Sequence, residues 1–81
     1  MKKKIINRNQ EKRLLETLDY DFGTYGISGV LFELQNGKYE VYYSKNNGDS
    51  IIDLYYNVFD IKEDAYKQYK ILNDKYKNDI M

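Results

Sequence analysis

Few residue types in this 81-residue chain could carry out chemistry, because it contains neither cysteine nor histidine. The lack of cysteine excludes thiol catalysis, a disulfide framework and thiolate-bound zinc or iron–sulfur clusters. The lack of histidine removes the commonest general base and the commonest metal ligand. The chain does have 13 acidic residues and ten tyrosines.

The best candidate for a reactive pair is Glu33 opposite Glu40, facing each other across a hairpin. Two facing carboxylates can separate their pKa values and share the roles of acid and base. Together with Asp53 they could also hold a divalent cation. However, such a pair would lie on a flat sheet face with no cleft and no nucleophile nearby. We therefore expect no catalytic residue, no metal site and no cofactor, and we do not expect an enzyme.

The hairpin that carries these glutamates organises the rest of the chain. Asn36-Gly37 suits a type I′ turn, which needs positive φ at both central residues. This turn pairs Gln35 with Lys38 and places Glu33 opposite Glu40. One face of the hairpin then carries six apolar or aromatic side chains: Val30, Phe32, Leu34, Tyr39, Val41 and Tyr43. We expect this face to be the core, since a one-residue slip would turn a glutamate inward.

A further strand follows a second, asparagine-rich turn at residues 45–49. The strand is expected to run from Ser50 to Val58, with alternate side chains on the core face. Those alternate side chains are Ile52, Leu54, Tyr56 and Val58. The three predicted strands, the first of which spans Gly26–Gln35, form an antiparallel meander.

Two helices are expected on either side of the meander. The first spans Asn7–Leu18, with Asn7 as its cap, and the connection Asp19–Gly23 follows it, in which Gly23 supplies a positive φ. The second begins with a capping box at Asp60 and has a regular apolar stripe. That stripe consists of Ile61, Ala65, Tyr69, Leu72 and Tyr76. The predicted fold class is α+β in the order α-β-β-β-α, with both helices packed on one face of the three-stranded antiparallel meander.

Length and charge indicate one domain over residues 1–81, in which residues 1–6 could form a flexible basic tail. No run approaches the ~20 apolar residues of a membrane span, and no signal peptide is visible, so we expect a cytoplasmic protein. The net charge is zero but unevenly spread: residues 1–13 hold six basic residues against one acid. Residues 14–64 hold ten acids against three lysines, which makes the sheet region acidic.

The most informative surface is the sheet face that the two helices would leave open. Tyrosine offers a large contact area at low entropic cost, and neighbouring carboxylates attract a basic partner. An ordinary solvated face is the alternative, because tyrosine is common in strands for other reasons. The predicted partner-binding residues are Glu33, Glu40, Tyr42, Asp53 and Tyr55, with Asp19 and Asp21 at the rim.

Nucleic-acid binding is a second possibility, because the order α-β-β-β-α is also that of double-stranded RNA-binding domains. Those domains contact phosphate through the basic N-terminus of their last helix. Here the corresponding turn carries Asp60, Glu63 and Asp64, which would repel phosphate. The basic N-terminal residues keep a small RNA- or DNA-binding module as an alternative. A structural homodimer paired through an exposed edge strand is another.

One stretch resembles a known family. The run Gly37–Ser44 (GKYEVYYS), then Gly48, a third strand, Phe59-Asp60 and a helix with Glu63, Ala65 and Tyr66 make up the resemblance. Over about residues 31–72 it is similar to the C-terminal part of small bacterial immunity proteins of polymorphic or contact-dependent toxin systems. The asparagine-rich second turn departs from that pattern.

The resemblance implies an antitoxin that neutralises a cognate toxin, such as a nuclease, by stoichiometric protein–protein interaction without catalysis. A phage-encoded inhibitor of a host defence nuclease, acting like an anti-CRISPR protein, would have nearly the same surface. In either case the partner would be a protein with a basic surface, and the chain itself a monomer or homodimer.

Overall fold

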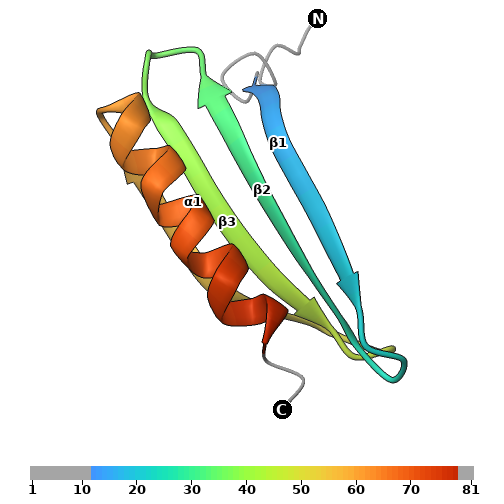
Figure 1. The fold of residues 1–81 in the computed structure, drawn as a ribbon. Coiled ribbons are helices and arrows are strands. Elements are labelled where there is room, and N and C mark those ends of the chain that lie inside the picture. The colour runs from blue at the N-terminus through green and yellow to red at the C-terminus, as the bar shows by residue number, and fades with distance from the viewer. Residues whose placement is uncertain (1–11, 79–81) are drawn as a thin grey trace, which may run out of the picture.

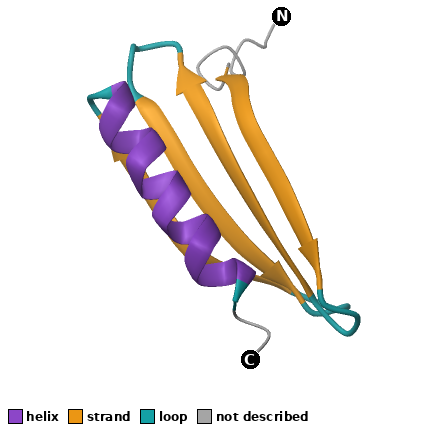
Figure 2. Ribbon diagram, viewed as in Figure 1, coloured by secondary structure: helices purple, strands orange, loops and turns teal. Residues whose placement is uncertain are grey.

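The computed structural model describes residues 12–78, which form a four-stranded antiparallel sheet and one C-terminal helix (Figure 1). The elements are β1 (Lys12–Asp21), β2 (Gly26–Leu34), β3 (Tyr39–Asn46), β4 (Ile51–Phe59) and α1 (Lys62–Lys77). The strands lie in the sheet in the same order as in the chain. Figure 2 shows the helix lying along one face of the sheet. The fold is therefore β-β-β-β-α, and the predicted α-β-β-β-α order with two helices is wrong.

The segment predicted as the first helix contributes a strand instead. Residues 7–11 of that helix lie outside the described residues, and the remainder belongs to β1. β1 pairs with β2 from Lys12 opposite Leu34 to Asp21 opposite Gly26, with a bulge at Leu15. A helix of about twelve residues with a short apolar stripe is marginal by itself. As a strand, the same residues satisfy the backbone groups along the edge of β2.

In the connection between β1 and β2 the predicted positive φ of Gly23 is confirmed, whereas Asp19–Asp21, predicted to belong to the connection, lie in β1. Gly23 has φ 96°, and its N–H donates to the Asp21 carboxylate at 2.9 Å. The N–H of Phe22 donates to the carbonyl of Tyr25 at 2.9 Å, which closes the turn. The glycine is needed here because few other residues adopt this backbone conformation without strain.

The β2–β3 hairpin closes one residue earlier than predicted. The carbonyl of Leu34 accepts the N–H of Gly37 at 3.1 Å, and the N–H of Leu34 donates to the carbonyl of Lys38 at 2.8 Å. The tight turn is thus Leu34–Gly37, with Gly37 at φ 87°. This is the three-residue hairpin loop that ends in a left-handed glycine. Glu33 consequently lies opposite Tyr39, and the predicted pairing of Glu33 with Glu40 is wrong.

Because of this shift in register, the two alternate sets of β2 side chains lie on the opposite faces from those predicted. Ile27 and Leu31 face α1 and are buried, at 1% and 0% exposure. The other alternate set of β2, predicted as core, lies on the opposite face: Val30, Phe32 and Leu34. In β3 the prediction is confirmed, since Val41 and Tyr43 are fully buried beneath α1.

Electrostatics explains why this register is preferred. The predicted pairing would place two glutamates directly opposite each other, and like charges in that position destabilise a sheet. In the observed pairing Glu33 and Glu40 point to opposite faces. Each then reaches a different cation of β1: Arg13 lies 3.2 Å from Glu33, and Lys12 lies 3.2 Å from Glu40.

The last strand and the helix complete the core. A bulge near Leu54 changes the alternation of β4, so Tyr55 lies on the α1 side and Tyr56 on the other. The apolar stripe of α1 is confirmed at four positions: Ala65, Tyr69, Leu72 and Tyr76 are buried. Ile61, the N-cap residue, is 54% exposed, and no side chain caps the helix. The predicted capping box is therefore wrong, and the Asp60 carboxylate instead accepts from Lys38 Nζ at 2.5 Å.

Tyr43 is the centre of the core. Its side chain is fully buried, and its hydroxyl donates to the carbonyl of Tyr69 at 2.9 Å and contacts Asn73 Oδ1. The ring lies directly over Gly29, where a Cβ atom would sit 2.3 Å from Tyr43 Cε2. Only glycine fits beneath this ring.

No helix in residues 12–78 has the length and apolar character to cross a membrane.

Candidate protein-binding face

The sheet face opposite α1 is not covered by any described element, and we call it the open face. Strand pairing arranges its side chains in rows that cross all four strands. The row nearest the β1–β2 turn is Asp19, Ser28, Ser44 and Asp53. The middle row is Thr17, Val30, Tyr42 and Tyr56. The third row is Leu14, Phe32, Glu40 and Val58. The open face therefore changes from acidic at one end to apolar at the other.

The acidic end carries Asp19, Asp21 and Asp53, all exposed. Asp19 accepts a hydrogen bond from Ser28 Oγ at 2.6 Å. A hollow of about 370 Å³ lies beside Asp19 and Asp21, where the β1–β2 turn approaches Asn46 and the β3–β4 turn. None of the three carboxylates forms an ion pair with a lysine or arginine in residues 12–78. Their charge is thus available to a cation from outside.

Two tyrosines form the centre of the open face. The hydroxyl of Tyr42 donates to Asp53 Oδ1 at 2.6 Å, and this bond to a carboxylate raises the pKa of the Tyr42 phenol. The ring of Tyr56 meets that of Tyr42 edge-on, with centroids 6.5 Å apart. Tyr56 is 59% exposed, so most of its ring can be covered by a partner. Aromatic side chains held in this way are typical contact residues.

An ion pair between Lys12 and Glu40 lies at the apolar end of the open face. Lys12 Nζ lies 3.2 Å from Glu40 Oε2 and 5.1 Å from the centre of the Phe32 ring. Glu40 is only 7% exposed, so its charge is neutralised within the fold. Leu14, in the same row but separated from Glu40 by Phe32, is 51% exposed. Glu40, predicted as a contact residue, lies on the open face but supports the sheet rather than offering a free carboxylate.

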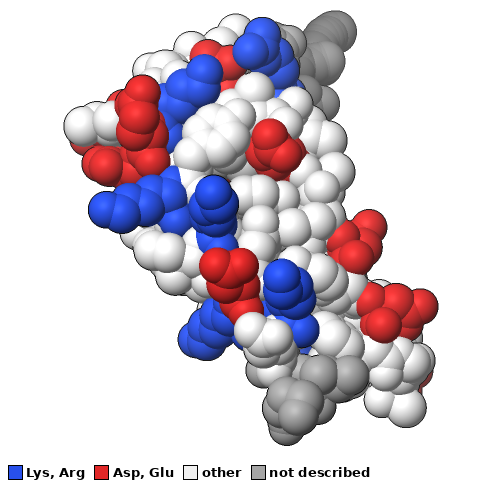
Figure 3. Space-filling view, in the orientation of Figure 1, with Lys and Arg blue, Asp and Glu red and all other residues white. Residues whose placement is uncertain are grey.

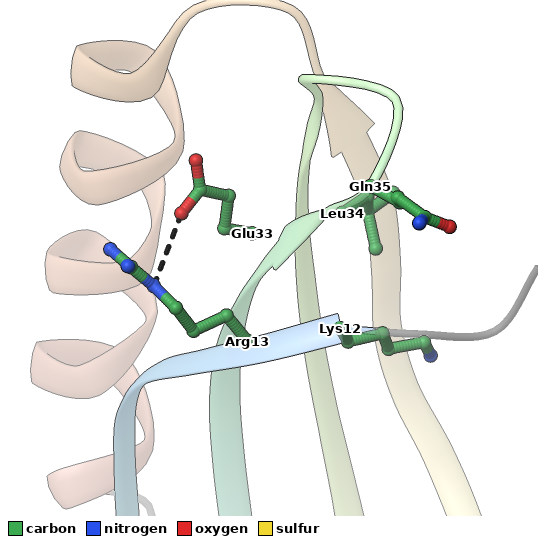
Figure 4. Close-up of a pocket in the computed structure, with 5 residues that line it drawn as sticks. All are labelled: Lys12, Arg13, Glu33, Leu34 and Gln35. Carbon is green, nitrogen blue, oxygen red and sulfur yellow. Dashed lines mark ion pairs between the residues drawn. The ribbon is translucent and has the colours of Figure 1, made fainter. Parts of the chain in front are cut away.

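Two other predicted contact residues, Glu33 and Tyr55, lie on the α1 side of the sheet and not on the open face. Figure 4 shows Glu33 and Arg13 pointing together to one side of the sheet, while Lys12 points to the other. Glu33 and Arg13 help to line a hollow of about 480 Å³ where β1 begins and β2 ends. Tyr55 packs against the core beneath α1. Neither Glu33 nor Tyr55 can share a surface with Asp53, because the sheet lies between them.

Strand pairing determines whether Glu33, Glu40 and Asp53 lie close enough to act together in catalysis or in metal binding. Glu33 and Glu40 point to opposite faces, so they cannot act as a pair on one substrate. Glu40 and Asp53 share a face but lie two rows apart, about 13 Å along the strands. In the part of the chain that the structure describes, no three Asp or Glu side chains lie close enough to hold a metal ion.

Sequence reasoning missed Leu14 and Tyr56 as members of the open face. It placed Asp19 and Asp21 in a loop, whereas β1 brings them onto the same face as Asp53. The alternation of Thr17, Asp19 and Asp21 with Leu18 and Tyr20 is the signal that could have revealed the strand.

The chain was also compared with known proteins. No family model matches it, and neither the curated proteins nor the solved structures gave a match. The function must therefore be inferred from the residues of the chain itself.

Proposed function

We propose that this protein is a non-enzymatic inhibitor that binds a basic protein partner through the open face, one copy to one. The observation that supports this most is the acidic end, where Asp19, Asp21 and Asp53 are exposed without a described cation beside them. Carboxylates at the edge of an interface speed association with a basic partner and disfavour acidic ones. Tyr56 and Leu14 add apolar area to the same face.

The open face is large enough for such an interface. Four strands at ~4.8 Å and about eight residues at ~3.4 Å give a flat area of roughly 500 Å². Side-chain relief increases the accessible area beyond this value, toward the ~800 Å² per partner of standard interfaces. The sheet backbone is already ordered before binding, which reduces the entropy lost on association.

The partner class follows from the charge. Nuclease toxins hold phosphate with basic surfaces, so an acidic face can occlude them or stand in for their substrate. The resemblance over about residues 31–72 supports the same role, that of an immunity protein acting in the cytoplasm. A phage-encoded inhibitor of a defence nuclease would use the same chemistry. The likeness to double-stranded RNA-binding domains is lost, because it depended on a first helix whose described part is β1.

A pair of matched variants tests the proposal. Asp19→Lys with Asp53→Lys reverses two charges on the open face, and Asp64→Lys with Asp74→Lys makes the same change on α1, where both side chains are exposed. Each variant serves as bait for proteins of the source cell. We expect the partner to be retained by the wild type and by the α1 variant, and lost by the open-face variant.

The captured partner is then purified and titrated by calorimetry. Two close charge pairs, at about 1.5 kcal/mol or more each, give an expected loss of affinity of at least 100-fold for the open-face variant. Inhibition of the partner should end at one equivalent. Equal affinity of the two variants, with thermal melts confirming that both are folded, would refute the role of the open face. Glu40 is unsuitable for this test because its substitution would disturb the fold.

A further inference from the structure

Within residues 12–78 the face beneath α1 is only partly covered. α1 packs mainly against β2, β3 and β4, and Figure 1 shows β1 lying beyond the helix. Four strands span about 14 Å between the outer two and more with their side chains, whereas one helix is about 10–12 Å wide. The sheet therefore has room for a second helix beside α1, over β1 and the neighbouring part of β2.

A groove of about 590 Å³ lies at this place, between α1 and β1. Its lining includes Glu16 of β1 and, from α1, Tyr66, Tyr69 and Asn73. Figure 3 shows uncharged surface beside α1, and both basic and acidic side chains over the helix itself. The lining positions of α1 run from residue 62 to residue 73, about 16 Å or three helical turns. This length suits an extended occupant better than a compact small molecule.

One side of the groove is basic. Lys62, Lys67 and Lys70 line it from α1, and we call them the lysine wall. Within residues 12–78 none of the three forms an ion pair. Lys62 Nζ lies 6.0 Å from the centre of the Tyr66 ring, above the floor of the groove. Two acids also line the groove, Glu16 from β1 and Glu63 from α1, so three lysines against two acids leave the lining with one excess positive charge.

We propose that this groove seats an amphipathic helix of a protein partner, with acidic residues toward the lysine wall and apolar residues over Tyr66 and Tyr69. A helix in a groove typically makes apolar contacts at positions i, i+3, i+4 and i+7. Packed at the usual 8–10 Å from α1, it would cover the uncovered side of β1. Leu15 and Leu18, which are only partly buried, would gain cover from it.

Charge complementarity favours a partner over other occupants. The chain's own residues 1–11 hold four basic residues against one acid, so they match the lysine wall poorly. The α1 helix of a second copy holds five lysines against three acids and would place lysines against lysines. The surface is separate from the open face, so this inference does not depend on the proposed inhibitor role.

Two synthetic peptides test the proposal. Both are 16 residues long with the same leucine stripe, and their flanks carry glutamates in one and lysines in the other. Each is titrated into the full ¹⁵N-labelled chain and followed by NMR. We expect the glutamate peptide to bind at least tenfold more tightly and to shift the signals of Glu16, Tyr66 and Lys70.

Matched variants on α1 supply the control. Lys62→Glu with Lys70→Glu should abolish the preference for the glutamate peptide. Lys75→Glu with Lys77→Glu makes the same charge change outside the groove and should leave the preference intact. Equal affinity of both peptides for the wild type would overturn the proposal, as would shifts confined to the open face. If the NMR signals of residues 1–11 shift when the peptide is added, the chain's own N-terminus is the occupant of the groove, and the proposal is overturned as well.

Discussion

Removal of the Lys12 charge should destabilise the fold far more than removal of the Arg13 charge. Both residues lie in β1 and both form ion pairs at 3.2 Å, Lys12 with Glu40 and Arg13 with Glu33. The two pairs differ in burial. The side chains are 32% and 9% exposed in the first pair, and 75% and 36% exposed in the second. Substitution by methionine removes each charge while keeping most of the apolar stem.

The expected magnitudes follow from this difference. Breaking a fully buried ion pair destabilises by about 3–5 kcal/mol, because it leaves a buried charge without a partner. Lys12 is about one-third exposed and water can partly replace it, so we expect Lys12→Met to lower the free energy of unfolding by roughly 1.5–3 kcal/mol. An exposed pair contributes about 0–1 kcal/mol, so Arg13→Met should change it by less than about 1 kcal/mol. For a domain of this size each kcal/mol shifts Tm by about 4–8 °C.

Urea denaturation followed by far-UV circular dichroism at pH 7 measures both effects. The double variant Lys12→Met with Glu40→Met provides the decisive control. It removes the stranded carboxylate, so it should recover most of the stability that Lys12→Met loses. Equal destabilisation by Lys12→Met and Arg13→Met would refute the reasoning. A double variant no more stable than Lys12→Met would refute it as well.

Two further predictions concern Tyr43 and its neighbours. Gly29→Ala should lower the free energy of unfolding by about 2–4 kcal/mol in urea denaturation, because its Cβ would displace the Tyr43 ring. The Cβ of Gly26→Ala would lie 3.1 Å from its nearest atom, the Tyr20 carbonyl oxygen, so this variant should change the free energy of unfolding by under about 1 kcal/mol. Similar values for the two variants would contradict the prediction. Burial raises the pKa of Tyr43, and burial with the charge of Glu16 raises the pKa of Tyr69 to about 12. Since both pKa values rise on folding, stability is fully present below pH ~10 and falls as the pH rises toward 12, by about 2–3 kcal/mol for Tyr69 alone. Constant stability between pH 9 and 12 in the same assay would contradict this.

Much of the fold follows from local signals in the sequence. The glycines at positions 23 and 37 mark turns, the alternation from Gly26 to Phe59 marks strands, and the stripe of α1 matches its buried face. From the sequence, β1 was not predicted as a strand because of the bulge at Leu15. Leu14, Leu15 and Leu18 fit one face of a helix, and the extra residue at Leu15 interrupts the two-residue period that would have revealed a strand.

The register of the hairpin could not be read from its own residues. Asn36-Gly37 fits both a two-residue turn and a three-residue turn that ends in glycine. β2 is apolar on both faces, so its pattern does not choose between them. The observed register lets Lys12 and Arg13 of β1 pair with the two glutamates, and β1 lies about 20 residues earlier in the sequence than these glutamates. Contacts of that kind are invisible to local pattern reasoning.

The register of the hairpin and the bulges of β1 and β4 determine which predicted contact residues lie on the open face. Four of the predicted contact residues share the open face with their polar atoms accessible, namely Asp19, Asp21, Tyr42 and Asp53. Glu33 and Tyr55 lie on the other side because of the register shift and the β4 bulge. Glu40 shares the open face but is engaged by Lys12. The charge pattern was thus predictable, whereas the assignment of residues to faces was not.

The open face holds its two outer carboxylates at a fixed separation. Asp19 lies on β1 and Asp53 on β4, three strand spacings or about 14 Å apart. Each is oriented by one hydroxyl at 2.6 Å, Asp19 by Ser28 and Asp53 by Tyr42, and in each the bond engages Oδ1. Oδ2 remains to accept a lysine or arginine of the partner. Because both acceptors are positioned before binding, little rotamer entropy is lost when the cation arrives. A partner should therefore be selected by the spacing of its basic side chains as well as by its charge.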